Sequence, residues 1–360
     1  MTAEITGKRR GITGTRLKII AMVAMFIDHF SAILLDGYLS KVLPTDAEAL
    51  ETFFRDNPAT DFIYLLMIVM RLIGRFGFPI FAFLIVEGFQ HTRDVKKYAL
   101  NLAIFALISE LPFNLGFAGK LLAPHYQNVF LTLLFGLLCI ASISYLQEKQ
   151  QTQKRWKPLF YLSALVAGPF AYYMIRQCFL YQGLKEGVFA YLKSNQEVLD
   201  RLKQALDFGI DMELTTKLFL ACMVVIGILS FVVILIVAAV KKWDVAQMNS
   251  FSFLILPLTV FCALGDLLST DYGSCGVLVI AVIYLLRQNK ENAFMWGCIV
   301  LTLMSFVEIT AFFMMIPISK YNGERGRKIN KYIFYAFYPV HIAVLYFIGL
   351  LIGFVSFSIK

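Results

Sequence analysis

The sequence predicts an all-α fold, a polytopic transmembrane helical bundle of about ten spans with both termini in the cytoplasm. Hydrophobic residues make up 59% of the 360 residues and charged residues only 16%, whereas soluble domains carry about 25% charged residues. The mean hydropathy is +0.71. Apolar runs of about 20 residues, the length with which an α-helix crosses the hydrocarbon core, recur along the chain. The predicted spans are residues 17–36, 62–88, 98–116, 128–146, 158–175, 217–240, 251–269, 274–287, 293–317 and 332–355.

The first predicted span, LKIIAMVAMFIDHFSAILLD, contains the adjacent ionisable residues Asp28 and His29 well inside its apolar run. A charged side chain at bilayer depth costs roughly 3 kcal/mol on insertion scales, so such residues mark functional positions. A basic cluster from Lys8 to Lys18 precedes the span, and no A-x-A-like cleavage site follows it. We therefore predict an uncleaved first helix that enters from the cytoplasm.

Lysine and arginine in the short loops predict the orientation of the spans. Residues 37–61 are acidic and are expected outside, whereas the basic segment 91–97 returns inside. Residues 319–331 are also basic, yet ten spans with both ends inside place this loop outside. Residues 176–216 show helix-like spacing of apolar residues and predict an amphipathic excursion on the outer face.

The second predicted span carries Arg71 and Arg75, which are four residues apart and share a helix face. Arg71 lies about 15 Å from Asp61 along the helix, and Asp28 lies about 16 Å from Leu17. The two sites are therefore expected at similar depth from opposite ends.

Three later spans each carry one ionisable group near the middle, namely Glu110, Glu308 and His341. Intramembrane ionisable groups usually face the bundle interior and pair with one another. A purely structural alternative stays open, in which the arginines of the second span partner Glu110 and Glu308. The six cysteines form no CxxC motif or Cys/His cluster, so no metal site is predicted.

Several segments resemble the TraX family, membrane proteins associated with acetylation of conjugative pilin. The resemblance rests on LKIIAMVAMFIDHFSAILL, on RLIGRFGFPIFAFLIVEGFQHTRDVKKYALNLAIFALISELPFNLGF, and on QNVFLTLLFGLL, DYGSCGVLVIAVIYLLR, YNGERG and KYIFYAFYPVHIAVLYFI. These segments cover most of residues 17–146 and 265–350. We expect one membrane domain with TraX-like cores at 1–146 and 251–360 and an insertion at 147–250.

The resemblance implies an acyl-CoA-dependent acyltransferase in the cell membrane, the bacterial inner membrane. TraX proteins resemble a wider class that includes acyltransferase-3 and heparan-type N-acetyltransferases. That class transfers acetyl from cytosolic acetyl-CoA, and a first-helix histidine, matched here by His29, is thought to be essential. The acceptor stays open between a peptide amine, a glycan hydroxyl and a lipid-linked sugar. The length of the acyl chain and the oligomeric state also stay open.

We expect His29 to act as general base, because its pKa suits proton transfer near neutral pH. A covalent acyl-histidine intermediate is the alternative. Asp28 points about 100° away on the helix, so it is expected to pair with an arginine or to orient His341. The predicted catalytic residues are His29, Asp28, Arg75, His341 and Glu308.

The cofactor-binding residues are expected to be cationic, because no glycine-rich nucleotide loop is present. Arg71 and Arg75 are expected to hold a phosphate or the pantetheine end of coenzyme A, or to stabilise the oxyanion. Phosphates at the cytoplasmic mouth suit His91, Arg93, Lys96 and Lys97.

Two other functions compete with acyl transfer. A proton-coupled transporter or flippase would use Asp28, Glu110 and Glu308 as a relay, and a non-catalytic scaffold would need none of these groups. The net charge of +9 indicates orientation and contact with anionic lipid headgroups, and no nucleic-acid partner is expected.

Overall fold

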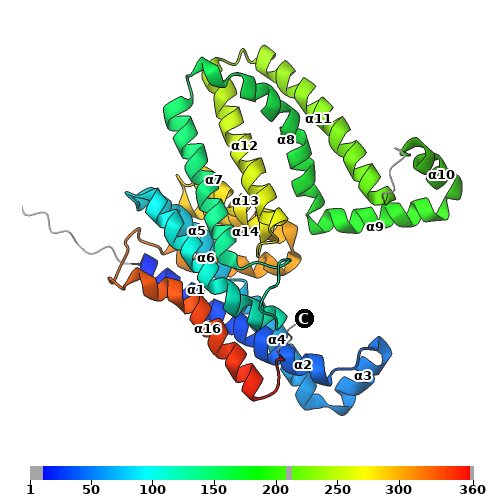
Figure 1. Cartoon of the computed structure of the whole chain (residues 1–360), viewed down its shortest axis with the longest axis vertical. Helices are drawn as coiled ribbons and strands as arrows, with labels where there is room; N and C mark the ends of the chain where they lie inside the picture. The colour runs from blue at the N-terminus through cyan, green and yellow to red at the C-terminus, as the bar shows by residue number, and fades with distance from the viewer. Residues whose placement is uncertain (1–10, 208–212, 357–360) are drawn as a thin grey trace, which may run out of the picture. The chain divides into compact units, whose positions relative to one another are not determined.

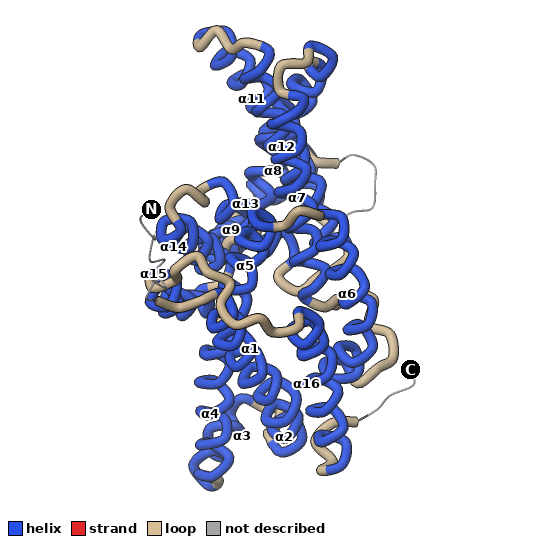
Figure 2. The backbone as a smooth tube through the Cα atoms, turned by 90° about the vertical axis from the view of Figure 1, so that its left-hand side faces the viewer, coloured by secondary structure: helices blue, strands red, loops and turns tan. Residues whose placement is uncertain are grey.

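The computed structural model describes residues 11–207 and 213–356, and its ordered elements are helices (Figure 2). Lys8, Arg9 and Arg10 of the basic N-terminal cluster lie outside these residues. Eight helical segments are long and apolar enough to cross a membrane, and two shorter apolar ones accompany them. The prediction of an all-α polytopic bundle is therefore confirmed. The eight segments are Gly14–Val42, Pro58–His91, Val95–Ala118, Val129–Gln150, Pro158–Arg176, Leu214–Val240, Val245–Leu267 and Lys331–Leu351.

The chain divides into two units. The first comprises Met1–Leu137, Leu264–Thr302 and Val307–Lys360, and the second comprises Leu138–Ala263 and Leu303–Phe306. The second unit encloses residues 147–250, for which the boundaries of an insertion stay a prediction. Every ionisable residue singled out in the spans belongs to the first unit.

The first helical segment is continuous through α1 (Gly14–Phe30), a π-helical stretch (Ser31–Leu35) and α2 (Asp36–Val42). Its 29 residues extend about 43 Å, more than the roughly 30 Å of the hydrocarbon core. Asp28 lies midway between Gly14 and Val42. The π-helical stretch begins two residues after His29, and such irregular turns often accompany functional sites. After it, α3 (Ala47–Asp56) leads to the next long segment.

The second segment is broken in the middle, into α4 (Pro58–Gly74) and α5 (Gly77–His91). Pro58 occupies the first turn of α4, where a missing N–H costs nothing. A Cβ on Gly74 would lie 2.1 Å from Oδ1 of Asp28, so only glycine allows this approach of α4 to α1. The break leaves Arg75 at the end of α4, between the two helices.

Helix α6 (Val95–Ala118) and helix α16 (Lys331–Leu351) pack along one another, and α16 also contacts α1 (Figure 1). The Asp94 side chain caps α6 by accepting a hydrogen bond from the Lys97 N–H at 2.9 Å. Gly119, with φ +64°, ends α6 in the left-handed conformation. The following helix, α7 (Val129–Gln150), starts within the first unit.

The predicted ninth span, residues 293–317, is wrong as a single helix. The chain forms α14 (Lys290–Met304), then a 3-10 helix (Phe306–Met314) and α15 (Met315–Ser319). The Lys290 ammonium donates hydrogen bonds to the carbonyls of Ser319, at 3.1 Å, and Tyr321. The segment therefore returns to its starting end as a hairpin, with arms of about 22 Å that are shorter than the hydrocarbon core.

This hairpin changes the expected topology. Glu324 in the basic loop accepts a hydrogen bond from the Gly14 N–H at 2.9 Å, so the loop lies at the N-terminal end of α1. At the other end, the ring of Phe354 lies 5.2 Å from that of Tyr38. The two described chain ends thus lie at opposite ends of the first helix. Loop 319–331 therefore lies at the same end of the first helix as Gly14, and the expectation that it lies on the side opposite the N-terminal end is wrong. The described ends do not share one end of this helix, as ten passes require, because the re-entrant hairpin removes one pass.

The remaining helices of the first unit are α13 (Gly273–Leu285), which packs on α5, and the end of α12 (Val245–Leu267). Their connection holds two non-glycine residues in the left-handed region, Ser269 at φ +50° and Tyr272 at φ +64°. Such conformations are costly and persist only where surrounding contacts impose them.

In the second unit, α8 (Pro158–Arg176) packs closely on α11 (Leu214–Val240). A Cβ on Gly168 would lie 2.5 Å from Cβ of Ser230, which is the small-residue contact typical of membrane helices. The stretch expected to be amphipathic forms α9 (Phe179–Ser194) and α10 (Gln196–Ala205). Its helical character is confirmed, and its placement on the outer face stays a prediction.

Candidate functional site

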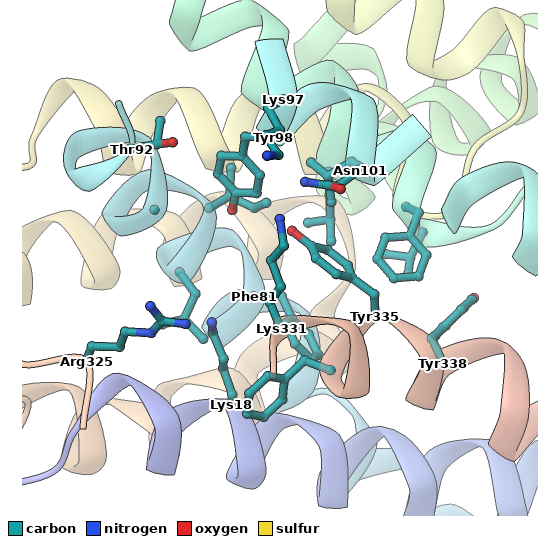
Figure 3. Close-up of a pocket in the computed structure, with 18 of the residues that line it drawn as sticks. Lys18, Phe81, Thr92, Lys97, Tyr98, Asn101, Arg325, Lys331, Tyr335 and Tyr338 are labelled. Atoms are coloured by element: carbon teal, nitrogen blue, oxygen red, sulfur yellow. The ribbon is translucent and has the colours of Figure 1, made fainter. Parts of the chain in front are cut away.

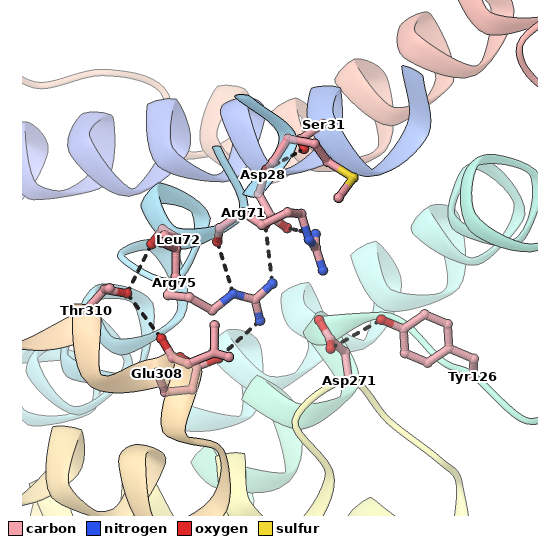
Figure 4. A network of polar contacts seen from close by, with 11 residues as sticks. Asp28, Ser31, Arg71, Leu72, Arg75, Tyr126, Asp271, Glu308 and Thr310 are labelled. Carbon is pink, nitrogen blue, oxygen red and sulfur yellow. Dashed lines mark hydrogen bonds and ion pairs between the residues drawn. The ribbon is translucent and has the colours of Figure 1, made fainter. Parts of the chain in front are cut away.

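An ion-pair network ties α1 to α4 and to the hairpin (Figure 4). Asp28 Oδ2 accepts a hydrogen bond from Arg71 Nη1 at 2.7 Å, and Asp28 Oδ1 accepts one from Arg75 Nη2 at 3.3 Å. Arg75 Nη1 also donates to Glu308 Oε1 at 3.1 Å. The expected pairing of Asp28 with the arginines is therefore confirmed, as is the pairing of Arg75 with Glu308.

The network is largely withdrawn from solvent. The exposed side-chain fractions are 14% for Asp28, 19% for Arg75 and 6% for Glu308, but 39% for Arg71. Buried charges are tolerated when they are paired and hydrogen-bonded. Glu110 does not join the network, because its Oε2 accepts a hydrogen bond from Asn128 Nδ2 at 2.6 Å. The alternative in which Glu110 partners an arginine is wrong.

His29 and His341 form a second polar cluster, between α1 and α16. His29 Nδ1 lies 2.7 Å from His341 Nε2, and the two rings are within 3° of coplanar. His341 Nδ1 lies 2.6 Å from the carbonyl oxygen of Phe337. A carbonyl only accepts, so His341 Nδ1 carries a proton and its neutral ring presents Nε2 as an acceptor. His29 Nδ1 is then the donor, and His29 Nε2 keeps its lone pair.

The two clusters occupy different faces of α1, as the 100° step from Asp28 to His29 requires. Among the described residues, no hydrogen bond or ion pair joins the histidine pair to the arginines. The ring of Phe117 lies 5.1 Å from His29 and that of Tyr338 lies 5.7 Å from it. The histidine pair and the ion-pair network are therefore separate clusters, and aromatic rings pack against His29 on the second face.

A cavity of about 490 Å³ is lined by residues of α1, α5, α6, α7 and α16 (Figure 3), and its lining includes neither His29 nor His341. Cationic side chains from five parts of the first unit line one end of it. These are Lys18, Arg93, Lys97, Arg325 and Lys331. The rest of the lining is mostly apolar, with the carboxylate of Asp94 among the cations, and its aromatic rings are those of Phe81, Tyr98, Phe130, Phe334, Tyr335 and Tyr338.

The cavity runs from the cationic end toward the histidines. On α1 its lining includes Lys18 and Met25, and on α16 it includes Lys331 and Tyr338. Seven residues separate each pair, which corresponds to a depth of about 10 Å. Met25 lies one helical turn before His29, as Tyr338 does before His341. Met25 and Tyr338 of the cavity lining are thus each one turn from a histidine of the pair.

Only some of the residues predicted to bind phosphate line the cavity. Arg93 and Lys97 line the cavity, whereas His91 and Lys96 do not. His91 Nδ1 donates instead to the carbonyl oxygen of Glu87 in its own helix, at 2.8 Å. Arg71 and Arg75 also lie outside the cavity lining, because the carboxylates of the network hold them.

Sequence reasoning missed several lining residues. Lys18 was counted only as an orientation signal, and Arg325 and Lys331 belonged to the basic loop that did not fit the span count. The sequence did carry one indication of Arg325 and Lys331, namely that the basic loop 319–331 did not fit the predicted orientation. A loop at the N-terminal end of α1 lies beside the other cations of the cavity. Tyr338 carried no signal beyond its position one turn before His341.

A further acidic group faces the network from the loop between α12 and α13. Asp271 N–H donates to the Gln127 carbonyl at 2.8 Å, and Tyr126 Oη lies 3.5 Å from Asp271 Oδ1. Burial raises the pKa of Asp271 to about 6, although the charges of Arg75 and Arg71 lower it.

These features define a polytopic α-helical membrane protein with an ion-paired core, a buried histidine pair, and a cationic cavity whose lining includes residues one helical turn from each histidine. Within the described residues, no group of three or more His, Cys, Asp or Glu side chains is placed to hold a metal ion. The family model for the TraX protein matches residues 13–260 and 188–349, and the chain belongs to this family. No curated protein and no solved structure matches the chain.

Proposed function

We propose that this protein is an acyl-CoA-dependent acyltransferase of the bacterial inner membrane, which transfers acetyl to an amine or hydroxyl of an envelope acceptor. The observation that carries the proposal is the cavity, which has cations at one end and ends one helical turn from His29. Membership in a family associated with pilin acetylation supports the same chemistry.

The cavity has the chemistry that coenzyme A requires. Its phosphates suit the cationic end, where Arg93 and Lys97 of one segment meet Arg325 of the basic loop. The positive-inside rule assigns that end to the cytoplasm, where acetyl-CoA is available. The aromatic lining suits the uncharged pantetheine arm, which would place the thioester toward Tyr338.

The histidine pair supports general-base catalysis. His29 Nε2 would take the proton from the acceptor amine or hydroxyl as that atom attacks the thioester carbonyl. The carbon–sulfur bond then breaks with its electron pair on sulfur, and the thiolate recovers the proton from His29. His341 acts as a positioning residue, because its acceptor nitrogen holds the His29 ring and its tautomer.

The transporter alternative is less well supported by the geometry. Asp28 and Glu308 of the expected relay are both bound to Arg75, and Glu110 is bound to Asn128. Carboxylates fixed in ion pairs are poor carriers of a proton, since protonation would break the pair.

The test uses purified protein in lipid vesicles with acetyl-CoA labelled in the acetyl group. We expect saturable release of free thiol and transfer of the label to an added acceptor or to water. Binding of acetyl-CoA without any thioester loss, in the presence of an envelope extract, would contradict the proposal. Substrate flux without thioester loss would instead support transport.

A further inference from the structure

We propose that Arg71, Tyr126 and Asp271 form an acceptor subsite for an anionic carbohydrate, beside the face of α1 that carries Asp28. The inference rests on the proposed function, and it narrows the acceptor class that the function left open. The three residues come from α4, the loop before α7 and the loop before α13. Figure 4 places Asp271 and Tyr126 across from the two guanidinium groups.

The first argument is the unusual exposure of Arg71. The α4–α5 segment is 34 residues long, and Arg71 is close to its midpoint, yet 39% of its side chain is exposed. An arginine at bilayer depth does not face lipid, so it faces a water-filled or ligand-filled space. Among the described residues, its guanidinium is held by one side-chain hydrogen bond, to Asp28. Most of its N–H donors are therefore directed at that space, in the fork geometry that suits a carboxylate or phosphate.

The second argument is the tyrosine beside it. Tyr126 is 43% exposed, although its ring packs on Phe113 at 4.9 Å and its hydroxyl points to Asp271. An exposed aromatic face beside a carboxylate is the arrangement that a sugar ring needs. Its C–H face stacks on the aromatic ring, and its hydroxyls donate to the carboxylate. The exposed ring of Tyr126 and the guanidinium of Arg71 together suit a sugar that carries an acidic group, which is why we favour an anionic carbohydrate.

The third argument is the fixed position of Asp271. Two backbone hydrogen bonds with Gln127 hold its loop, from Gln127 N to the Ser269 carbonyl at 2.9 Å and from Asp271 N to the Gln127 carbonyl at 2.8 Å. The loop is held although Ser269 and Tyr272 adopt left-handed backbone conformations. Strain of this kind persists where surrounding structure imposes it, and it often marks a binding position.

The subsite is close enough to the base to serve the same reaction. Asp28, which holds Arg71, is the chain neighbour of His29. The Phe117 ring lies 5.1 Å from His29 and 6.5 Å from Tyr126. Phe117 thus lies between Tyr126 and the imidazole, so the reacting hydroxyl of a sugar stacked on Tyr126 has to extend past this ring to reach His29.

The experiment measures binding of two matched probes, methyl β-D-glucuronide and methyl β-D-glucoside, to the full-length protein in lipid nanodiscs by saturation-transfer NMR. We expect the glucuronide to bind about tenfold more tightly than the glucoside, because only the glucuronide has a carboxylate for Arg71. Arg71→Gln and Tyr126→Ala are each expected to weaken glucuronide binding about tenfold. Arg71→Lys keeps the positive charge but lacks the planar guanidinium, so it should lower the affinity for the glucuronide by an intermediate amount.

Acetyl-CoA binding to the same preparations separates the two proposals. If acetyl-CoA binds and the glucuronide does not, or if Arg71→Gln and Tyr126→Ala bind it as the unaltered protein does, the subsite is wrong and the acyltransferase proposal is unaffected. If acetyl-CoA does not bind, the proposed function itself fails. The thermal unfolding midpoint of each variant shows that it is folded, and Tyr126→Phe, which keeps the ring, should retain most of the glucuronide binding.

Discussion

His341 holds His29 in one tautomer. The 2.7 Å contact between His29 Nδ1 and His341 Nε2, together with the bond from His341 Nδ1 to the Phe337 carbonyl, makes His29 Nδ1 a donor. The lone pair on His29 Nε2 is then available to accept a proton. The carbonyl of a helix supplies this orientation, a role that a carboxylate more often plays.

Replacement of His341 should therefore lower turnover through the orientation of His29. We expect His341→Leu to lower kcat about 10- to 100-fold with little change in the KM for acetyl-CoA, because the general base loses its fixed geometry. His341→Gln should recover much of the rate, since its amide oxygen can accept from His29 Nδ1–H. Equal rates for the two variants would show that His341 has only a packing role.

The cationic end of the cavity predicts a charge effect on acetyl-CoA affinity. Lys331 lines the cavity, whereas Lys328, three residues earlier in the same basic stretch, is exposed and does not. Lys331→Ala should raise the KM for acetyl-CoA about tenfold and weaken its dependence on salt, because one charge-assisted contact to phosphate is lost. The matched control Lys328→Ala should change the KM less than about twofold. Equal effects would show that general surface charge, rather than the cavity, attracts the cofactor.

Gly74 predicts a sharp steric effect on stability. A Cβ at this position would lie 2.1 Å from Asp28 Oδ1, so Gly74→Ala must separate α4 from α1 and disturb the ion pairs. We expect a loss of about 1–3 kcal/mol, as for other overpacked sites. A Cβ added at Gly183 in α9 would have no atom within 4 Å. Gly183→Ala should therefore be neutral or raise stability by up to about 1 kcal/mol. The thermal unfolding midpoints of both variants in one detergent provide the measurement.

Asp271 predicts a pH dependence of stability. Its pKa of about 6 in the folded protein exceeds the unfolded value of about 3.9. The folded state therefore binds the proton more tightly, so the stability that this group contributes is full below about pH 4 and is lost as the pH rises through about 6. The loss amounts to at most about 3 kcal/mol.

The variant Asp271→Asn should lack this component. Between about pH 4.5 and pH 7, its unfolding midpoint should fall less than that of the unaltered protein. Parallel curves for the two proteins would show that the Asp271 carboxyl is not held in a buried position.

The sequence was sufficient for the fold class and for the Asp28–Arg71 pair. Length and hydropathy are enough to predict a membrane span. Asp28 and Arg71 were expected at similar depth in two spans, and their opposite charges indicated that they pair. The partner of Glu110 was not predictable, because Asn128 lies in a loop whose return toward α6 depends on tertiary contacts. The pairing of His29 with His341 was not predicted either, since depth along a helix does not determine which face meets which neighbour.

The hairpin at residues 290–319 shows a second limit. The run CIVLTLMSFVEITAFFMMIP stays apolar through the break at Ser305, without a glycine or a proline to mark it. Its reversal is recorded by the contact between Lys290 and Ser319 at its two ends. Hydropathy cannot distinguish one long span from two short arms of the same composition, so the topology was wrong by one pass.

The central claim is that His29 removes the acceptor proton at the inner end of the cavity. The most direct measurement is the rate of thiol release from acetyl-CoA by protein in lipid nanodiscs, at saturating acetyl-CoA. We predict that His29→Ala lowers this rate about 10²- to 10⁴-fold while acetyl-CoA still binds. A His29→Ala protein that releases thiol at the rate of the unaltered protein would contradict the account.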